Sequence, residues 1–204
     1  MSSINKLEDY QIVEKIDGWD INMFSVIVER YEKKLLKYIL NQSNVSIEDA
    51  ENILQDVFIK VYKNINSYNR TYKFSSWIYR IAYTTTIDNY KKHKNINENT
   101  TSIDVDLWDW EWTTNSLLDL IEDENQNIHE NLKRKELSSK VREIINQLEP
   151  KYKDVILLKY IEWMSYDEIT DILTIPSNTV WTLINRAKKQ IKKIAIAEDI
   201  NNYL

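Results

Sequence analysis

The scarcity of glycine and proline limits the folds that this chain of 204 residues can adopt. It contains one glycine, Gly18, and two prolines, Pro150 and Pro176. Tight turns between β-strands depend on such residues, so the chain has little material for hairpins. We therefore expect an all-α fold.

The composition is that of a chain with a packed core, because 43% of its residues are hydrophobic and 11% are aromatic. Its formal net charge of -5 argues against a protein that coats nucleic acid by bulk electrostatics, but it leaves room for local basic faces. The chain has no cysteine, and no stretch resembles a signal peptide or a membrane-spanning helix. We expect a soluble, cytoplasmic protein with no membrane insertion.

The sequence does not suggest a catalytic or metal site. The two histidines, His93 and His129, lack the spacings that are typical of metal ligands on a helix, and a single glycine leaves no Gly-rich phosphate loop. We therefore expect a binding protein and not an enzyme, with no cofactor and no metal.

Two amphipathic helices are predicted in the N-terminal half. Between Met23 and Leu40, apolar side chains recur every three or four residues. Ser46 and Asp49 resemble a capping box, after which a second apolar face runs from Ala50 to Ile65. The opposite face of this second helix carries Glu51, Gln55, Asp56 and Lys60. It is either a solvated surface or a docking site, and the pattern favours neither.

A third helix is predicted from Phe74 to Lys94, after a polar loop over residues 66–73. The helix combines aromatic, hydroxyl and basic side chains, and Asp88 is its only acid. This local polarity indicates contact with phosphate groups. Tryptophans and tyrosines at helical spacing also suit a plain core, however, and lysines at a helix C-terminus suit the helix dipole. Taken alone, the stretch favours the core interpretation.

The segment that follows is acidic and aromatic. From Asp104 to Glu130 the chain has nine acids and no lysine or arginine, which is typical of a linker. Its leucines and tryptophans are too apolar for a passive spacer, so we expect it to pack, either in a basic channel of a partner or on the protein's own lobes.

The C-terminal part predicts a helix-turn-helix. A helix should end before Pro150, which then lies in the first turn of the next helix. Ser165 and Glu168 form a second capping box that opens a short helix. After a break at residues 174–176, a long basic helix begins, capped by Ser177 or Asn178, and its size fits the major groove of DNA.

Two stretches resemble the bacterial RNA polymerase sigma factors of the extracytoplasmic-function (ECF) group. AENILQDVFIKVYKNI (residues 50–65) followed by FSSWIYRIA (residues 74–82) is similar to the family's second conserved region, and LEPKYKDVILLKYIEWMSYDEITDILTIPSNTVWTLINRAKKQI (residues 148–191) to its fourth. The resemblance implies a second-region domain over residues 1–95, an acidic, Trp-rich linker over residues 96–131 and a fourth-region domain over residues 132–204.

The resemblance also implies function. It implies an alternative sigma factor that binds core RNA polymerase, recognises promoter DNA and promotes strand opening, with an inhibitory anti-sigma protein as a further partner. By similarity, the residues at the polymerase are Gln55, Asp56, Val57 and Phe58. Those at the minus-ten element are Tyr68, Asn69, Arg70, Lys73, Ser75, Ser76, Trp77, Tyr79, Arg80, Thr84, Lys91 and Lys92. Those at the minus-thirty-five element are Ser177, Asn178, Thr179, Trp181, Thr182, Asn185, Arg186, Lys188 and Lys189.

The chain departs from the family pattern at three positions of the fourth region. Thr174 stands where the turn usually has glycine, so the turn either takes another conformation or tolerates a positive φ at a cost of about 1 kcal/mol. Trp181 and Leu183 stand where many relatives have basic residues. Trp181 either contacts a thymine methyl group or is buried.

Other classes of function are also open to an all-helical chain. The main alternative is a helix-turn-helix regulator that binds duplex DNA without polymerase. The aromatic stretch from Trp77 to Lys92 argues against it, because a simple repressor needs no second reader. An α-helical enzyme and a helical scaffold are weaker alternatives.

Overall fold

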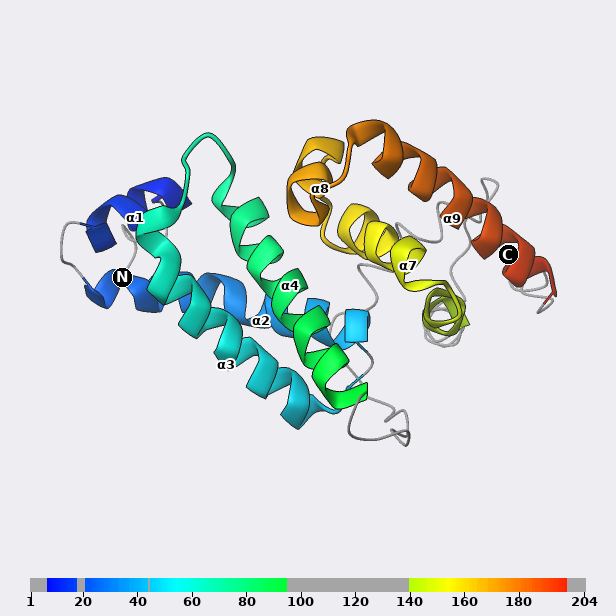
Figure 1. The fold of residues 1–204 in the computed structure, drawn as a ribbon, viewed down its shortest axis with the longest axis horizontal. Coiled ribbons are helices and arrows are strands. Elements are labelled where there is room, and N and C mark those ends of the chain that lie inside the picture. The colour runs from blue at the N-terminus through cyan, green and yellow to red at the C-terminus, as the bar shows by residue number, and fades with distance from the viewer. Residues whose placement is uncertain (1–6, 18–20, 44, 95–139, 198–204) are drawn as a thin grey trace, which may run out of the picture. The chain divides into compact units, whose positions relative to one another are not determined.

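The computed structural model describes residues 7–17, 21–43, 45–94 and 140–197 (Figure 1). Every regular element among these residues is a helix, which confirms the predicted all-α class. The chain divides into two compact units, of which the first contains the helices before residue 95 and the second contains residues 140–170 and 175–197. The predicted linker lies outside the described residues. Within them, no helix has the length and apolar character needed to cross a membrane.

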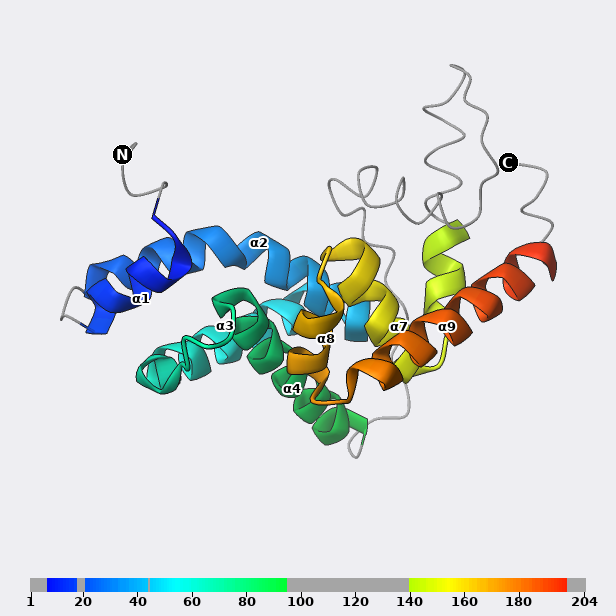
Figure 2. The same cartoon turned by 90° about the horizontal axis from the view of Figure 1, so that it is seen from above.

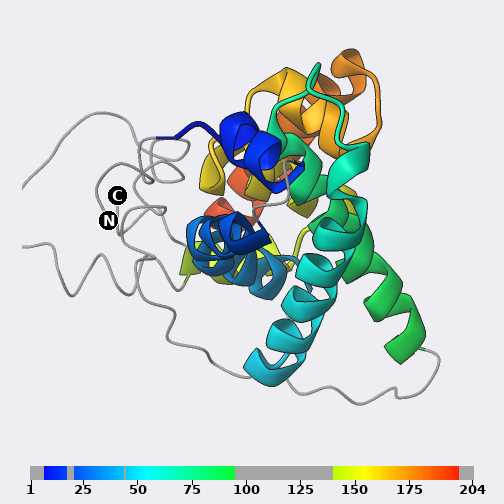
Figure 3. The same cartoon turned by 90° about the vertical axis from the view of Figure 1, so that its left-hand side faces the viewer.

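The first unit is built on three long helices. These are α2 (Phe24–Ser43), α3 (Ile47–Asn64) and α4 (Phe74–Lys94), and each contacts the other two (Figures 1 and 3). Their shared core includes Ile27, Leu35, Val57 and Ile78, none of which is exposed. A 3-10 turn, η2 (Ile21–Met23), precedes α2, and another, η3 (Ile65–Ser67), follows α3.

The predicted cap of α3 is confirmed. Ser46 has an extended backbone, with φ -61° and ψ 159°, and its Oγ accepts a 3.1 Å hydrogen bond from the backbone N–H of Asp49. The Ser46 hydroxyl in turn donates to the Asp49 carboxylate at 2.7 Å. Such a cap contributes about 1 kcal/mol, because it satisfies a backbone donor that the helix itself leaves without a partner.

A short helix that the sequence did not predict, α1 (Asp9–Asp17), packs on α2 (Figure 2). The Asp9 carboxylate accepts hydrogen bonds from the Arg30 guanidinium and the Tyr31 hydroxyl, and Arg30 Nη2 also donates to the backbone oxygen of Leu7 at 3.0 Å. Burial and the bond to Asp9 raise the pKa of Tyr31, so its hydroxyl remains a donor. These polar contacts, together with the buried side chains of Ile12, Val13 and Ile16, fix α1 to the unit.

The second unit begins, among the described residues, with a helical segment at residues 140–146. It continues with α7 (Pro150–Ile156), the π-helical turn η4 (Leu157–Ile161), α8 (Tyr166–Leu173) and α9 (Ser177–Ala197). Pro150 lies at the start of α7, as predicted. The core of this unit includes Val155, Leu158, Ile169 and Val180, which are 0% exposed.

Helices α8 and α9 form the predicted helix-turn-helix (Figure 1). The capping box at α8 is confirmed, because the Ser165 N–H donates to Glu168 Oε2 at 2.8 Å and the Glu168 N–H donates to Ser165 Oγ at 3.2 Å. At the start of α9, the backbone N–H groups of Thr179 and Val180 donate to the carbonyl of Pro176. The backbone of Pro176 therefore takes the cap position that was expected at Ser177 or Asn178.

Two residues in and just before the helix-turn-helix have a backbone conformation that favours glycine. Thr174, in the turn between α8 and α9, has φ 56°, and Trp163, just before α8, has the same value. The sequence left open whether the turn changes its conformation or tolerates a positive φ at Thr174. The turn keeps the left-handed conformation, although Thr174 is β-branched. Such a conformation crowds Cβ against the backbone and costs about 1 to 2 kcal/mol.

Candidate functional site

The predicted polymerase residues lie near the middle of α3. Gln55 and Asp56 are exposed and Phe58 is half-buried, with its ring centroid 6.5 Å from that of Phe24 in an edge-to-face contact. Val57 is 0% exposed, so its side chain belongs to the core of the unit. We therefore leave Val57 out of the docking face and keep Gln55, Asp56 and Phe58.

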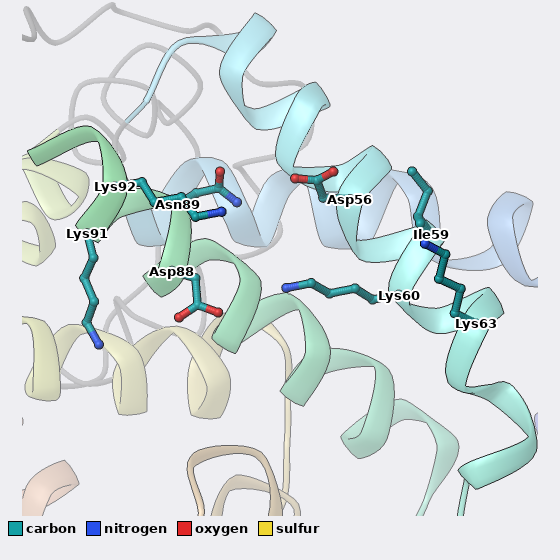
Figure 4. A pocket seen from close by; sticks show the side chains of 8 residues that line it. All are labelled: Asp56, Ile59, Lys60, Lys63, Asp88, Asn89, Lys91 and Lys92. Carbon is teal, nitrogen blue, oxygen red and sulfur yellow. The ribbon is translucent and has the colours of Figure 1, made fainter. Parts of the chain in front are cut away.

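A groove of about 500 Å³ lies between α3 and α4 (Figure 4). It is lined by Asp56, Ile59, Lys60, Lys63, Asp88, Asn89, Lys91 and Lys92. Lys60 extends from α3 toward α4, where its Nζ donates to Thr85 Oγ1 at 3.0 Å. The predicted docking residue Asp56 and two lysines predicted at DNA thus line the same groove. The groove is lined by four lysines and two aspartates, so its net charge is positive.

The loop before α4 is held by its own contacts. The Tyr68 hydroxyl donates to the backbone oxygen of Tyr72 at 2.6 Å, and Asn69 Oδ1 accepts from the Thr71 N–H at 3.0 Å. The Tyr68 ring lies 5.2 Å from Phe74 and 5.5 Å from Trp77, measured between centroids. Tyr68 and Trp77 are half-buried and Phe74 is buried beneath them, at 3% exposure. The cluster therefore presents two partly exposed rings at a defined place, which suits stacking on an unpaired base.

A charged contact ties this loop to α1. Arg70 Nη1 lies 2.7 Å from the Glu14 carboxylate, and both side chains are about half exposed, at 52% and 49%. An exposed pair of this kind contributes at most about 1 kcal/mol. No local pattern could have indicated Glu14 as a partner of the loop, because Glu14 and Arg70 are far apart in the chain and α1 itself was not predicted.

Helix α4 separates its predicted minus-ten residues onto different faces. Arg80, Thr84, Lys91 and Lys92 are exposed, and Ser75 and Trp77 are half-buried. Ser76 and Tyr79 are each 2% exposed, and Tyr79 packs edge-on against Tyr38 at 5.3 Å. Successive residues of a helix are turned by about 100°, so positions this close in sequence cannot all face a ligand. Ser76 and Tyr79 therefore belong to the core and are left out of the candidate interface.

The first turn of α9 presents a polar surface. Ser177, Asn178 and Thr179 are exposed. The Thr182 hydroxyl donates to the backbone oxygen of Asn178 at 2.8 Å, so its proton is used within the helix. Trp181 is 60% exposed, which excludes the buried alternative.

The basic residues of α9 follow its uncharged first two turns. Arg186 and Lys189 are exposed, and Asn185 is half-buried. Lys188 Nζ lies 5.4 Å from the centre of the Tyr160 ring, a cation-π contact that holds it over the end of η4. This order fits a helix whose N-terminal turns enter a groove while its basic turns meet phosphates.

The fold and these surfaces define a class: an all-helical DNA-binding protein with a helix-turn-helix unit and a separate helical unit that carries an aromatic loop. Comparisons with known proteins agree with this class. Residues 27–96 match the family model described as Sigma-70 region 2, and residues 138–191 match Sigma-70, region 4.

Curated relatives match along most of the chain. It is 33% identical over 184 residues to the ECF RNA polymerase sigma factor SigW of Bacillus subtilis, covering 89% of this chain and 93% of SigW. It is 30% identical over 187 residues to the ECF RNA polymerase sigma-E factor of Haemophilus influenzae, covering 92% and 95%. The chain therefore belongs to the ECF group of RNA polymerase sigma factors, which confirms the resemblance. It is an alternative sigma factor for transcription initiation, with core RNA polymerase and promoter DNA as partners.

Solved structures share the fold at low sequence identity. CnrH, in complex with the cytosolic domain of CnrY, has a TM-score of 0.64 at 17% identity and covers 93% of this chain and 97% of its own. The sigma factor RpoE in complex with the anti-sigma factor NepR, from Bartonella quintana, has a TM-score of 0.57 at 15% identity, with 83% and 94% covered.

Proposed function

We propose that the exposed side chains of Gln55 and Asp56, bordered by Phe58, form the surface of this sigma factor that docks on core RNA polymerase. Their exposure at the middle of a rigid helix supports the proposal, since a docking face needs fixed and accessible groups. Asp56 also lines the groove between α3 and α4, together with four lysines. A polymerase surface that docks there would contact both acidic and basic side chains.

The first unit would then capture a base of the melted minus-ten element. Extruding a base from the duplex costs a few kcal/mol, and stacking on an aromatic ring returns about 1 to 3 kcal/mol. Tyr68 and Trp77 supply the rings, and Asn69, Arg70 and Lys73 are polar or basic residues of the loop that carries Tyr68. Ser75, Arg80, Thr84, Lys91 and Lys92 complete the proposed interface along α4. The observation that carries this proposal is the aromatic cluster of Tyr68, Phe74 and Trp77, held by the loop's own hydrogen bonds.

The second unit would read the minus-thirty-five element with α9. Ser177, Asn178, Thr179, Trp181, Thr182 and Asn185 are proposed to face the bases, and Arg186, Lys188 and Lys189 the phosphates. Phosphate contacts fix the position of the helix, whereas contacts with base edges carry the sequence preference.

Three further features belong to the proposal. The protein acts in the cytoplasm, together with the polymerase, and is a specificity subunit without catalytic activity of its own. The solved relatives CnrH and RpoE are bound to CnrY and to the anti-sigma factor NepR, respectively. We propose that an inhibitory protein of this kind also binds the present chain.

The test is promoter opening in the presence of core polymerase. The parent protein should support run-off transcription and make thymines near the start site reactive to permanganate. The double variant Tyr68→Ala, Asn69→Ala should reduce this reactivity more than it reduces closed-complex binding, because base capture stabilises only the open state.

Tyr68→Phe is the matched control. It keeps the ring against Trp77 and removes only the hydrogen bond to Tyr72, so it should retain most of the opening. Tight, specific binding to promoter duplex without polymerase, together with no reactive thymines when polymerase is added, would instead identify a polymerase-independent regulator.

A further inference from the structure

Trp181 is a large apolar side chain on the exposed part of α9. It is 60% exposed, whereas Val180, Ile184 and Ala187, which face the core, are 0 to 1% exposed. An indole in this position adds little to the core, because most of its surface stays in water. Single exposed apolar residues are common, so exposure alone does not establish a role.

The position of Trp181 within α9 indicates a role for its exposed side chain. No lysine or arginine occurs before Arg186 in this helix, so Trp181 lies among uncharged residues, with Asn178 and Asn185 within one turn on either side. In a helix-turn-helix, the N-terminal residues of the second helix contact base edges in the major groove. Trp181 is the largest exposed side chain in that part of α9.

We propose that Trp181 selects a thymine in the upstream promoter element by packing against its 5-methyl group. This inference rests on the proposed role of α9 as the reading helix. It assigns to one residue a preference that the proposed function leaves open.

The chemistry of the indole favours thymine over the other bases. Indole has one N–H donor and no acceptor, so it cannot pair with the amino groups that cytosine and adenine present in the major groove. Adenine presents one acceptor, N7, and guanine presents two, N7 and O6, so a single indole N–H could donate to either purine without distinguishing them. Thymine alone offers an apolar group there, and this group matches the aromatic surface that Trp181 exposes.

The test removes the methyl group and nothing else. Holoenzyme, assembled from core polymerase and the full chain, is first used to select upstream elements from a duplex pool with a randomised upstream region. In the selected duplex, each thymine is then replaced in turn by deoxyuridine, and binding is measured by competition. One position should lose about fourfold in affinity, which corresponds to the transfer of one methyl group out of water.

The effect must depend on Trp181. In Trp181→Ala holoenzyme, the same replacement should leave binding nearly unchanged, because the methyl group no longer has an indole to contact, and the thymine preference at that position should disappear. Trp163→Ala is the matched control, since Trp163 is an equally exposed tryptophan of the second unit, at 62%, that lies outside α9. Arg186→Ala should weaken binding to all sequences while keeping the deoxyuridine effect.

The possible outcomes separate this inference from the proposed function. If no deoxyuridine position weakens the parent, or if Trp181→Ala shows the same loss as the parent, the inference is wrong while the reading role of α9 stands. If Trp181→Ala weakens assembly with core polymerase and leaves the selected element unchanged, Trp181 contacts protein instead of thymine, and the inference is also wrong. If the holoenzyme selects no upstream element at all, the proposed role of the second unit fails.

Discussion

Replacing Thr174 with glycine should stabilise the helix-turn-helix formed by α8 and α9. Thr174 is exposed and has φ 56°, so the substitution removes Cβ crowding without removing a buried contact. The relief is about 1 to 2 kcal/mol, and the greater freedom of glycine in the unfolded chain offsets about 0.5 to 1 kcal/mol of it. The midpoints of these two ranges give a net gain of about 0.75 kcal/mol for Thr174→Gly.

Amide hydrogen exchange measures this gain in the helix-turn-helix alone. The slowest amides of α8 and α9 exchange through unfolding of the unit, so a gain of this size should slow them by about two- to fivefold. Amides of α2 and α3 serve as an internal reference and should not change.

Thr174→Ala is the control for this explanation. Alanine keeps the Cβ atom, so it should give little or none of the gain. Equal slowing in the alanine and glycine variants would mean that the methyl or hydroxyl group of Thr174, and not the backbone conformation, is responsible. Faster exchange in Thr174→Gly would refute the strain argument.

Two other predictions follow from described residues. Asp56→Arg should weaken binding to core polymerase without changing the helical circular dichroism spectrum, because Asp56 is exposed; a pull-down equal to that of the parent would remove it from the docking face. Lys153 is 7% exposed, and burial lowers its pKa from 10.5 to about 8, while its Nζ donates to Asn146 Oδ1 at 2.9 Å. Between pH 8 and 10.5 the unfolded chain holds a proton that the folded chain releases, so stability should rise with pH in this window. Urea unfolding at a series of pH values should show a smaller rise for Lys153→Met than for the parent, and equal slopes would contradict the lowered pKa.

Helix boundaries could be predicted where a side chain marks them. Ser46 and Ser165 mark helix starts because their side chains accept hydrogen bonds from backbone N–H groups in the first turn. Pro150 marks another because it has no backbone N–H that would need a partner there. Helix α1 was missed because its apolar residues span little more than two turns, and it is held by polar contacts between Asp9 and α2 that no local pattern reveals.

The candidate site was predictable in its location but not in the direction of each side chain. The resemblance proposed a contact surface on α4, and periodicity indicated a buried stripe there, but neither separated Arg80, which is exposed, from its neighbour Tyr79, which is buried. That separation depends on where α2 packs, because the ring of Tyr38 takes the place beside Tyr79. The same holds for Val57 and Asp56 on α3, where adjacent residues face the core and the solvent.

The contact between Glu14 and Arg70 joins two segments that are synthesised at different times. The two residues are 56 positions apart, and ribosomes add about 5 to 20 residues per second, so Glu14 is made roughly 3 to 11 seconds before Arg70. Arg30, which binds Asp9, follows that residue by only 21 positions. The nascent chain can therefore dock α1 on α2 well before the loop emerges, and the loop then closes on a surface that is already in place.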